Sequence, residues 1–217
     1  MQKAVLFDMD GVLVDSEPVI LKSAIQGLSE FGVQAKPEDF REFVGAGEDR
    51  FVGGVAEKHG VPYVLDMKKR VYEIYCSLVD SELILFDEVP ETLSLLHSAG
   101  YRIAIASSAD RIKVNANIRA AGIPAEAVDA ILSGEDIERK KPFPDIFLLA
   151  AERLGVSPES CVVAEDAING IQAATAAGMK SIGVTSFFPA ETLLQEGAAV
   201  AVNQIKEIPA ILDGIFA

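Results

Sequence analysis

Four short stretches of the chain carry residue types that could transfer a phosphoryl group with the help of a metal ion. They are FDMDGVLVD at residues 7–15, the serine that closes IAIAS at 103–107, the lysine in KKPFPD at 140–145, and the acidic pair that closes VVAED at 162–166. Three of these polar groups follow runs of apolar residues, where buried strands would end. Ligand sites of open parallel sheets form at such strand ends, so the spacing predicts one shared site.

Asp8 and Asp10 are separated by a single residue at the end of the first apolar run. At this spacing one carboxylate could attack phosphorus while the other gives a proton to the leaving oxygen, and Gly11 would permit a tight turn. Taken alone, a DxDG stretch is explained more simply as a polar turn after a strand. The presence of the other three stretches in the same chain favours the catalytic interpretation.

A carboxylate that attacks a phosphate dianion meets like-charge repulsion, so such a site must hold a divalent cation. We expect Mg²⁺, held by Asp8, Asp166 and a carbonyl such as that of Asp10, which would leave the Asp10 side chain free for acid–base work. Glu165 would support this metal site or serve as an alternative ligand. Taken alone, Asp166 is interpreted more simply as a helix N-cap.

Ser107 and Lys141 are candidates for binding the phosphoryl group. Ser107 could donate a hydrogen bond to a phosphoryl oxygen, next to the amides of the following turn, and Ser108 is a further substrate-binding candidate. Lys141 could neutralise both Asp8 and the transferred group. Considered singly, Ser107, Ser108 and Asp110 read as helix caps, and Lys141 as a solvated lysine within a run of charges.

Apolar, strand-like runs alternate with amphipathic segments over most of the chain, which is the pattern of a doubly wound α/β fold with a parallel sheet. Strands are predicted at Ala4–Phe7, Arg102–Ala106, Ala130–Leu132, 161–164, 181–184 and 198–202, and helices at 92–98, 111–121, 144–155 and 168–177. Right-handed crossovers would place helices on both faces of the sheet.

Between residues 16 and about 81 the pattern changes to helical segments at 19–30, 50–59 and 67–78, with no buried strand. We therefore predict an α/β catalytic core at 1–15 and 84–217 and a small inserted helical cap at 16–83. Two connecting strands near Val12–Glu17 and Ser81–Asp87 would act as hinges, so that the cap could close over the site and exclude water.

The composition limits the function classes. A formal net charge of -14 argues against nucleic acid and acidic membrane surfaces as partners, and no apolar run reaches membrane-spanning length. The two cysteines, Cys76 and Cys161, lie far apart without a metal-binding pattern. Since the first strand pattern begins within a few residues of Met1, we expect no signal peptide and a soluble cytoplasmic protein, as a monomer or weak homodimer.

The four stretches, in this order, resemble the motifs of the haloacid dehalogenase superfamily, and the resemblance covers essentially the whole chain. It implies a Rossmann-like core. Residues 16–83 are similar to the C1-type helical cap of the branch that contains β-phosphoglucomutase and many sugar-phosphate phosphatases. The segments KKPFPDIFLLAAERLGV and VVAEDAINGIQAATAAGM are very similar to that branch.

By this resemblance, Asp8 is the nucleophile that forms an aspartyl-phosphate, and Asp10 is the general acid/base. Ser107 and Lys141 are the phosphate-binding pair, and Asp8, Asp10 and Asp166 are the Mg²⁺ ligands. Asp10 argues against dehalogenation, because members that displace halide usually lack the second aspartate.

Within the branch, the first hypothesis is a Mg²⁺-dependent phosphatase that acts on a small phosphorylated metabolite, of the sugar-phosphate class. The second is a β-phosphoglucomutase-like phosphomutase. The mutase usually carries a histidine at the position where this chain has Ile20. The mutase cap also presents an arginine that binds a distal phosphate, whereas the corresponding loop of this chain, residues 44–48, offers Glu48. Both departures favour the phosphatase, with Glu48 binding a hydroxyl-rich or cationic leaving group. Other cations of this region, Arg50, Lys68 and Lys69, could replace the arginine.

A third hypothesis, from another class, is a non-catalytic phospho-acceptor like a response-regulator receiver. Such a module also joins an aspartate, a metal, a Ser/Thr and a lysine on a parallel sheet. The helical insert and Asp10 disfavour it, since a receiver must keep its phosphoryl group long enough to signal.

Overall fold

The protein is described here from a computed structural model, which covers residues 2–43 and 47–216. The chain forms two compact units. The first comprises residues 1–15, 85–111 and 121–217, and the second comprises 16–84 and 112–120. The segment 112–120, which the sequence pattern assigns to the core, thus groups with the helical unit. The functional division into a catalytic core and a cap stays a prediction.

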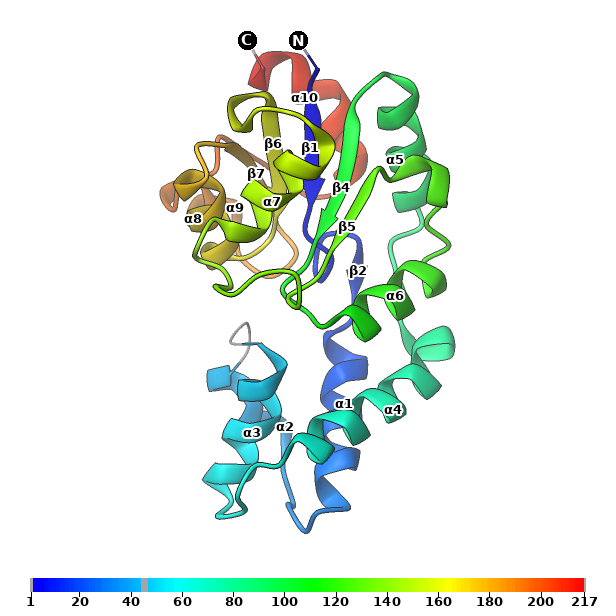
Figure 1. The fold of residues 1–217 in the computed structure, drawn as a ribbon, viewed down its shortest axis with the longest axis vertical. Coiled ribbons are helices and arrows are strands. Elements are labelled where there is room, and N and C mark those ends of the chain that lie inside the picture. Colours follow the sequence, from blue (N-terminus) through cyan, green and yellow to red (C-terminus); the bar gives the residue numbers. More distant parts are fainter. Residues whose placement is uncertain (1, 44–46, 217) are drawn as a thin grey trace. The chain divides into compact units, whose positions relative to one another are not determined.

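The first unit is built on a parallel sheet of six strands in the order β5-β4-β1-β6-β7-β8 (Figure 1). The strands are β1 (Ala4–Phe7), β4 (Arg102–Ala106), β5 (Ala130–Leu132), β6 (Cys161–Glu165), β7 (Lys180–Val184) and β8 (Val200–Val202). The central strand β1 is flanked by β4 and β6 and is buried on both faces, as expected for a sheet covered by helices on each side. This is the predicted doubly wound α/β fold.

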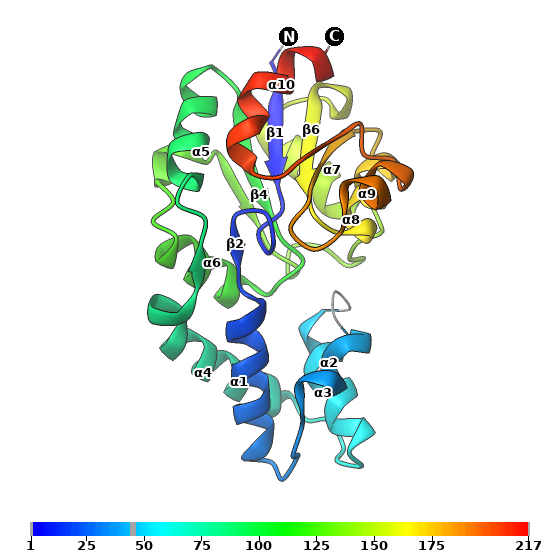
Figure 2. The ribbon, with the colours of Figure 1, turned by 180° about the vertical axis from the view of Figure 1, so that it is seen from behind.

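Helices cover both faces of this sheet. They are α5 (Val89–Ser98), α7 (Asp145–Leu154), α8 (Ile168–Ala176), α9 (Ala190–Gln195) and α10 (Ile208–Ile215). Helix α7 crosses the front of the sheet in Figure 1, and α10 crosses the opposite face in Figure 2. Alternate residues of β1, Ala4 and Leu6, pack with Ile146 and Phe147 of α7 in one buried cluster, because side chains along a strand point to the two faces in turn.

The second unit is helical and has its own hydrophobic core. Its helices are α1 (Glu17–Ser29), α2 (Pro37–Phe40), α3 (Glu48–Lys58) and α4 (Leu65–Glu82), joined by most of α6 (Arg111–Ala120). Ala116 of α6 packs into this core, and the Tyr75 hydroxyl of α4 donates a hydrogen bond to Asn117 Oδ1 at 2.5 Å. These buried contacts explain why α6 clusters with the helices rather than with the sheet.

Two very short strands, β2 (Val14–Asp15) and β3 (Ile84–Leu85), pair in a separate two-stranded sheet. They lie in the connections that the sequence analysis identified as hinges; their role as hinges stays a prediction.

All six predicted core strands are present, with ends shifted by at most two residues. The helices α2, α9 and α10 were not predicted; they have four, six and eight residues, which leaves little sequence over which a helical period can be recognised. Within residues 2–43 and 47–216, no helix is long and apolar enough to cross a membrane.

Candidate active site

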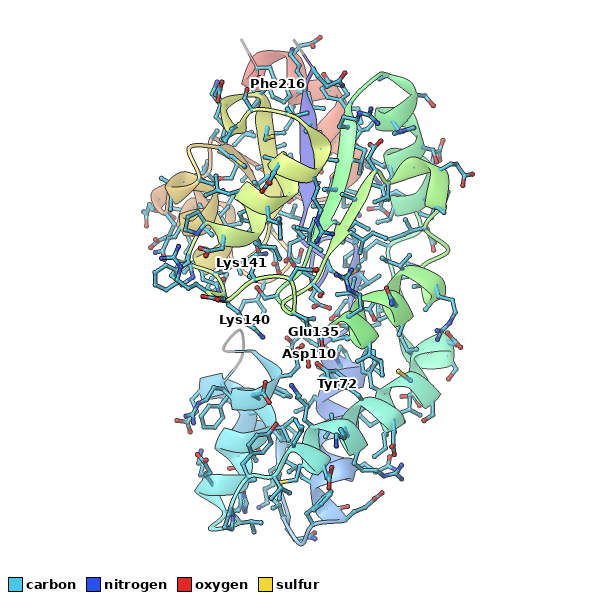
Figure 3. The ribbon with its side chains drawn as sticks, viewed as in Figure 1. Tyr72, Asp110, Glu135, Lys140, Lys141 and Phe216 are labelled. Carbon is cyan, nitrogen blue, oxygen red and sulfur yellow. The ribbon has the colours of Figure 1, made fainter. Side chains whose placement is uncertain are left out.

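The predicted core residues meet at the carboxyl end of the sheet. In the register of the sheet, Phe7 of β1 pairs with Ile105 of β4 and with Ala164 of β6, so the chain emerges from these strands at adjacent points. Asp8 follows β1, Ser107 follows β4, and Glu165 ends β6. Figure 3 shows Lys141, Lys140, Glu135 and Asp110 at this end of the sheet and Phe216 at the opposite end. The strand ends therefore place the groups much as the sequence predicts.

Lys141 is the cation at the centre of the group. Its Nζ lies 2.5 Å from Asp8 Oδ1 and 2.7 Å from Glu165 Oε2, and its side chain is only 4% exposed. It also packs over the Phe147 ring at 4.9 Å. Burial lowers the pKa of Lys141, but the charges and hydrogen bonds of Asp8 and Glu165 raise it by more. The net shift is upward, and the ammonium stays charged. Lys141 is therefore not a solvated surface lysine.

Asp8, Glu165 and Asp166 are buried together, each with a carboxylate oxygen within 4.8 Å of one on the other two. Burial raises the pKa of Asp8 from 3.8 to about 7, Lys141 opposes this, and Glu165 and Asp10 add to it. Burial also raises the pKa of Asp166 well above 3.8, with further contributions from Glu165 and Asp8. One lysine thus does not fully compensate three buried carboxylates.

This arrangement fits a hard divalent cation. All three ligand groups are carboxylates, the oxygen donors that Mg²⁺ prefers, and none is a thiolate or imidazole that would select a softer metal. A bound cation would also supply the positive charge that the cluster needs. The Asp10 side chain is not part of the three-carboxylate cluster found within the described residues; its carbonyl was the predicted ligand.

Glu165 has a partner on each carboxylate oxygen. Oε2 accepts from Lys141, and Oε1 accepts a hydrogen bond from the backbone N–H of Ala167 at 3.1 Å. Ala167 precedes α8, so Glu165, and not Asp166, accepts this bond at the start of the helix. Glu165 therefore fixes Lys141 and the turn into α8 at the same time.

Two glycines allow backbone to approach these carboxylates closely. A Cβ on Gly11 would lie 2.0 Å from Asp166 Oδ2, and one on Gly170 would lie 2.0 Å from Glu165 Oε2. Gly11 also has a φ of 80°, in the left-handed region that favours glycine. Both positions therefore require glycine for steric reasons at the site itself.

Two serines follow β4 at the same end of the sheet, the buried Ser107 and the partly exposed Ser108. Ser107 Oγ accepts a hydrogen bond from the Ala109 N–H at 3.1 Å, which leaves its own O–H as a donor for a ligand. Ser108 Oγ is buried, and no partner is found for it within the described chain. The first backbone N–H of α6, at Arg111, is bound by Glu135 Oε2 at 2.8 Å, so a residue from the β5 loop satisfies this helix end.

Asp10 lies in the tight turn after Asp8. Residues Leu13 and Val14 donate backbone hydrogen bonds to the Met9 carbonyl at 2.9 and 3.2 Å, and Asp10 forms a bridge with Val14. Asp10 is partly exposed, in contrast to the buried Asp8. The turn thus gives the two aspartates different environments, as two different chemical roles require.

Glu48 lies in the helical unit, at the start of α3, and its side chain is 12% exposed. Its Oε1 is 3.9 Å from Nζ of Lys113, a buried α6 residue that the sequence analysis did not single out. Residues 44–46 of the loop before Glu48 lie outside the described residues. Binding of a leaving group by Glu48 stays a prediction.

The three cations considered as replacements for the mutase arginine are paired with acids of their own unit. Arg50 lies 3.5 Å from Glu57, Lys68 2.9 Å from Asp49, and Lys69 2.8 Å from Asp66. A distal phosphate would have to compete with these carboxylates for each cation.

Comparison with known proteins assigns the family. A family model described as haloacid dehalogenase-like hydrolase matches residues 2–178. A phosphorylated carbohydrates phosphatase from Thermotoga maritima is 33% identical over 228 residues, covering 99% of this chain and all of the relative. The crystal structure of CbbY from Rhodobacter sphaeroides in complex with phosphate is similar with a TM-score of 0.84 and 30% identity, covering 96% of each chain.

The Arabidopsis thaliana protein SUPPRESSOR OF QUENCHING 1, chloroplastic, is 43% identical over 209 residues. The match covers 94% of this chain but 20% of that protein, so the chain spans about a fifth of the length of this relative. The family match over most of the chain, together with the relatives that match it over nearly their whole length, leads to one assignment: this chain is a member of the haloacid dehalogenase-like hydrolase family.

Proposed function

We propose that this chain is a Mg²⁺-dependent phosphatase that hydrolyses a small phosphorylated metabolite of the sugar-phosphate class through an aspartyl-phosphate. The observation that carries the proposal is the buried contact of Lys141 with Asp8 and Glu165, beside Asp166, at the end of the central strands. The similarity to a phosphatase of phosphorylated carbohydrates supports the substrate class.

In the first step, an Asp8 carboxylate oxygen attacks phosphorus, and the bond from phosphorus to the ester oxygen breaks. Asp10 gives its proton to the departing alkoxide, so an alcohol leaves. In the second step, Asp10 takes a proton from water, which attacks the phosphorus of the aspartyl-phosphate and releases inorganic phosphate and the Asp8 carboxylate. Asp10 lies two residues from Asp8 in the same turn, and its partly exposed position gives it access to the water of the second step.

Lys141 serves both steps by holding positive charge against Asp8 and against the phosphoryl oxygens, in a buried site where charges are weakly screened. The Ser107 hydroxyl is available to donate to a phosphoryl oxygen, and Ser108 lies beside it. Glu165 keeps Lys141 in place from the other side.

Asp8, Asp166 and Glu165, with the Asp10 carbonyl, are the groups that would hold Mg²⁺. The ion would supply positive charge that lets Asp8 act as an anion and that polarises the phosphoryl group.

The alternative is a β-phosphoglucomutase-type phosphomutase. Two observations disfavour it: Ile20 occupies the place of the mutase histidine, and Arg50, Lys68 and Lys69 are each paired with a carboxylate. We further propose that residues 16–83 act as a cap that selects the leaving group, with Glu48 among its contacts. The cytoplasmic location and the monomeric or weakly dimeric state stay predictions.

The experiment that tests the proposal is phosphate release in Mg²⁺ from a panel of sugar and polyol phosphates. It is run beside conversion of β-glucose 1-phosphate to glucose 6-phosphate with a bisphosphate activator. Release from a panel member that is lost in both Asp8→Asn and EDTA supports the phosphatase. Isomerisation without phosphate release would establish the mutase instead.

The Asp10→Asn variant distinguishes a receiver-like phospho-acceptor from a phosphatase. In a phosphatase, this variant should lose turnover. The phospho-enzyme then either accumulates or does not form. A chain that is phosphorylated once and holds the group equally long with or without Asp10 would be a phospho-acceptor.

A further inference from the structure

A hydrogen bond joins the loop after β7 to the turn that carries Asp10. Ser186, between β7 and α9, donates through Oγ to the carbonyl oxygen of Gly11. In the sheet, β6 lies between β7 and β1, so this bond spans the carboxyl end of β6, where Glu165 and Asp166 lie. Ser186 belongs to none of the four stretches that carry the chemistry.

The N–H, the Cα and the carbonyl oxygen of Gly11 each contact another residue. Its N–H donates to the Val14 carbonyl at 2.7 Å, and its Cα is packed so closely on Asp166 that a Cβ would lie 2.0 Å from Oδ2. The carbonyl oxygen is the remaining polar group of this residue, and Ser186 binds it. The N–H of the same peptide, at Val12, donates to the Met9 carbonyl in a long hydrogen bond of 3.4 Å, so Ser186 is the second group that fixes the peptide after Gly11.

The loop that presents Ser186 is anchored independently of Gly11. The Thr185 N–H donates to the Val202 carbonyl at 3.0 Å, which continues the pairing of β7 with β8 beyond Val184. Phe188 packs against a buried cluster of Ile171, Leu193 and Ala198. Ser186 is therefore a fixed donor, and its exposed hydroxyl contributes to the turn at Gly11 rather than to the core.

We propose that Ser186 is a positioning residue that holds Gly11, and through it Asp10, in the place from which Asp10 protonates the leaving group. The inference rests on the proposed phosphatase function. Asp10 and Gly11 lie in one turn, closed by the bonds of Gly11 with Val14 and of Val14 with Met9, so a shift of this turn at Gly11 moves the Asp10 carboxylate relative to Asp8. Displacements of this kind are costly in a site that depends on orientation.

The test compares Ser186→Ala with two matched variants. Ser186→Thr keeps a hydroxyl at this position. Thr185→Val removes a hydroxyl of the same loop, which donates to Asn203 Oδ1 at 3.0 Å, and keeps the backbone bond to Val202 that anchors the loop. For each variant, kcat/KM is measured with β-glycerophosphate or the best alkyl phosphate of the panel above, and with para-nitrophenyl phosphate. The alkyl ester needs a proton on its leaving oxygen, whereas para-nitrophenolate leaves as a stable anion, so only the first depends on Asp10 as an acid.

We expect Ser186→Ala to lower kcat/KM for the alkyl ester by about tenfold more than it lowers kcat/KM for the aryl ester. This factor is a part of the ~10²–10⁴-fold rate increase that general acid catalysis contributes. Ser186→Thr should restore the wild-type ratio, and Thr185→Val should leave it unchanged. Urea unfolding should give the same midpoint for Ser186→Ala and wild type, which excludes a general loss of structure.

Other outcomes overturn the inference. If Ser186→Ala matches wild type on both esters, or lowers both equally, Ser186 does not act through Asp10. If Thr185→Val changes the ratio as much as Ser186→Ala, the loop as a whole is responsible. A wild-type chain that hydrolyses neither ester overturns the proposed function itself, and the inference with it.

Discussion

Replacing the buried Asp8 carboxylate by an amide should stabilise the metal-free protein while removing its activity. In the folded chain, burial raises the pKa of Asp8 from 3.8 to about 7, despite the opposing charge of Lys141. Ionising Asp8 at neutral pH therefore costs folding free energy, because the unfolded chain ionises this group easily. At about 1.36 kcal/mol per pKa unit, the difference corresponds to about 4 kcal/mol at pH 7.

The sign follows from proton binding. Between the unfolded and folded pKa values of Asp8, the folded state binds more protons than the unfolded state, so the free energy of unfolding falls as the pH rises through this range. The amide side chain of the Asp8→Asn variant does not titrate. The excess stability of this variant over wild type should therefore grow from about 2 kcal/mol at about pH 5 to about 4 kcal/mol at about pH 7.

The assay is urea unfolding of both proteins in EDTA at these two pH values, followed by circular dichroism. Added Mg²⁺ should stabilise the wild type more than Asp8→Asn, because the ion would compensate the carboxylate that the variant lacks. A variant that is equally or less stable than wild type at both pH values would refute the electrostatic reasoning.

Asp129→Asn is the control of opposite sign. Burial raises the pKa of Asp129, but a hydrogen bond from the Ile103 N–H at 2.8 Å and the contact with Arg102 lower it more, so the net shift is downward. A lowered pKa contributes stability above the unfolded pKa, which is lost as the pH falls through the folded pKa. Asp129→Asn should therefore be less stable than wild type at neutral pH, with the difference shrinking in acid.

Three further predictions concern other contacts. Lys141→Ala should lower kcat by at least about 10²-fold in a phosphatase assay, because the site loses the charge 2.5 Å from Asp8; a near-wild-type rate would exclude Lys141 from the machinery. Gly11→Ala should lower activity and weaken Mg²⁺ binding by calorimetry, because its Cβ would lie 2.0 Å from Asp166 Oδ2, and unchanged binding would contradict the packing. Tyr75→Phe should destabilise the protein by about 1–2 kcal/mol in urea, because Asn117 loses a buried hydrogen-bond donor; no change would mean that the bond contributes nothing net.

Much of the site was predictable because its groups follow directly from strands. Asp8 and Ser107 lie one residue beyond β1 and β4, and Glu165 ends β6, so an apolar run followed by a polar residue locates each of them. Parallel strands bring their carboxyl ends to one edge, and no further information is needed to expect these residues together. The same alternation of runs and amphipathic segments predicted the sheet.

The contacts that set the energetics depend on groups far apart in the chain. Lys141 comes from a loop, and the sequence singles it out from Lys140 as the lysine that precedes Pro142; its burial between Asp8 and Glu165 depends on the fold. The size of the Asp8 pKa shift likewise depends on burial and on neighbours from other segments, which residue types and spacing do not determine.

The sequence by itself determined the fold class, the strand ends and the residue types available for phosphoryl transfer, because these depend on local periodicity and on the order of elements. Only the tertiary structure decided that α6 packs with the helical unit through Ala116 and Asn117, and that Ser186 binds Gly11 across the end of β6. Such contacts join residues that are remote in sequence, and they form only when packing brings those residues within hydrogen-bonding or van der Waals distance.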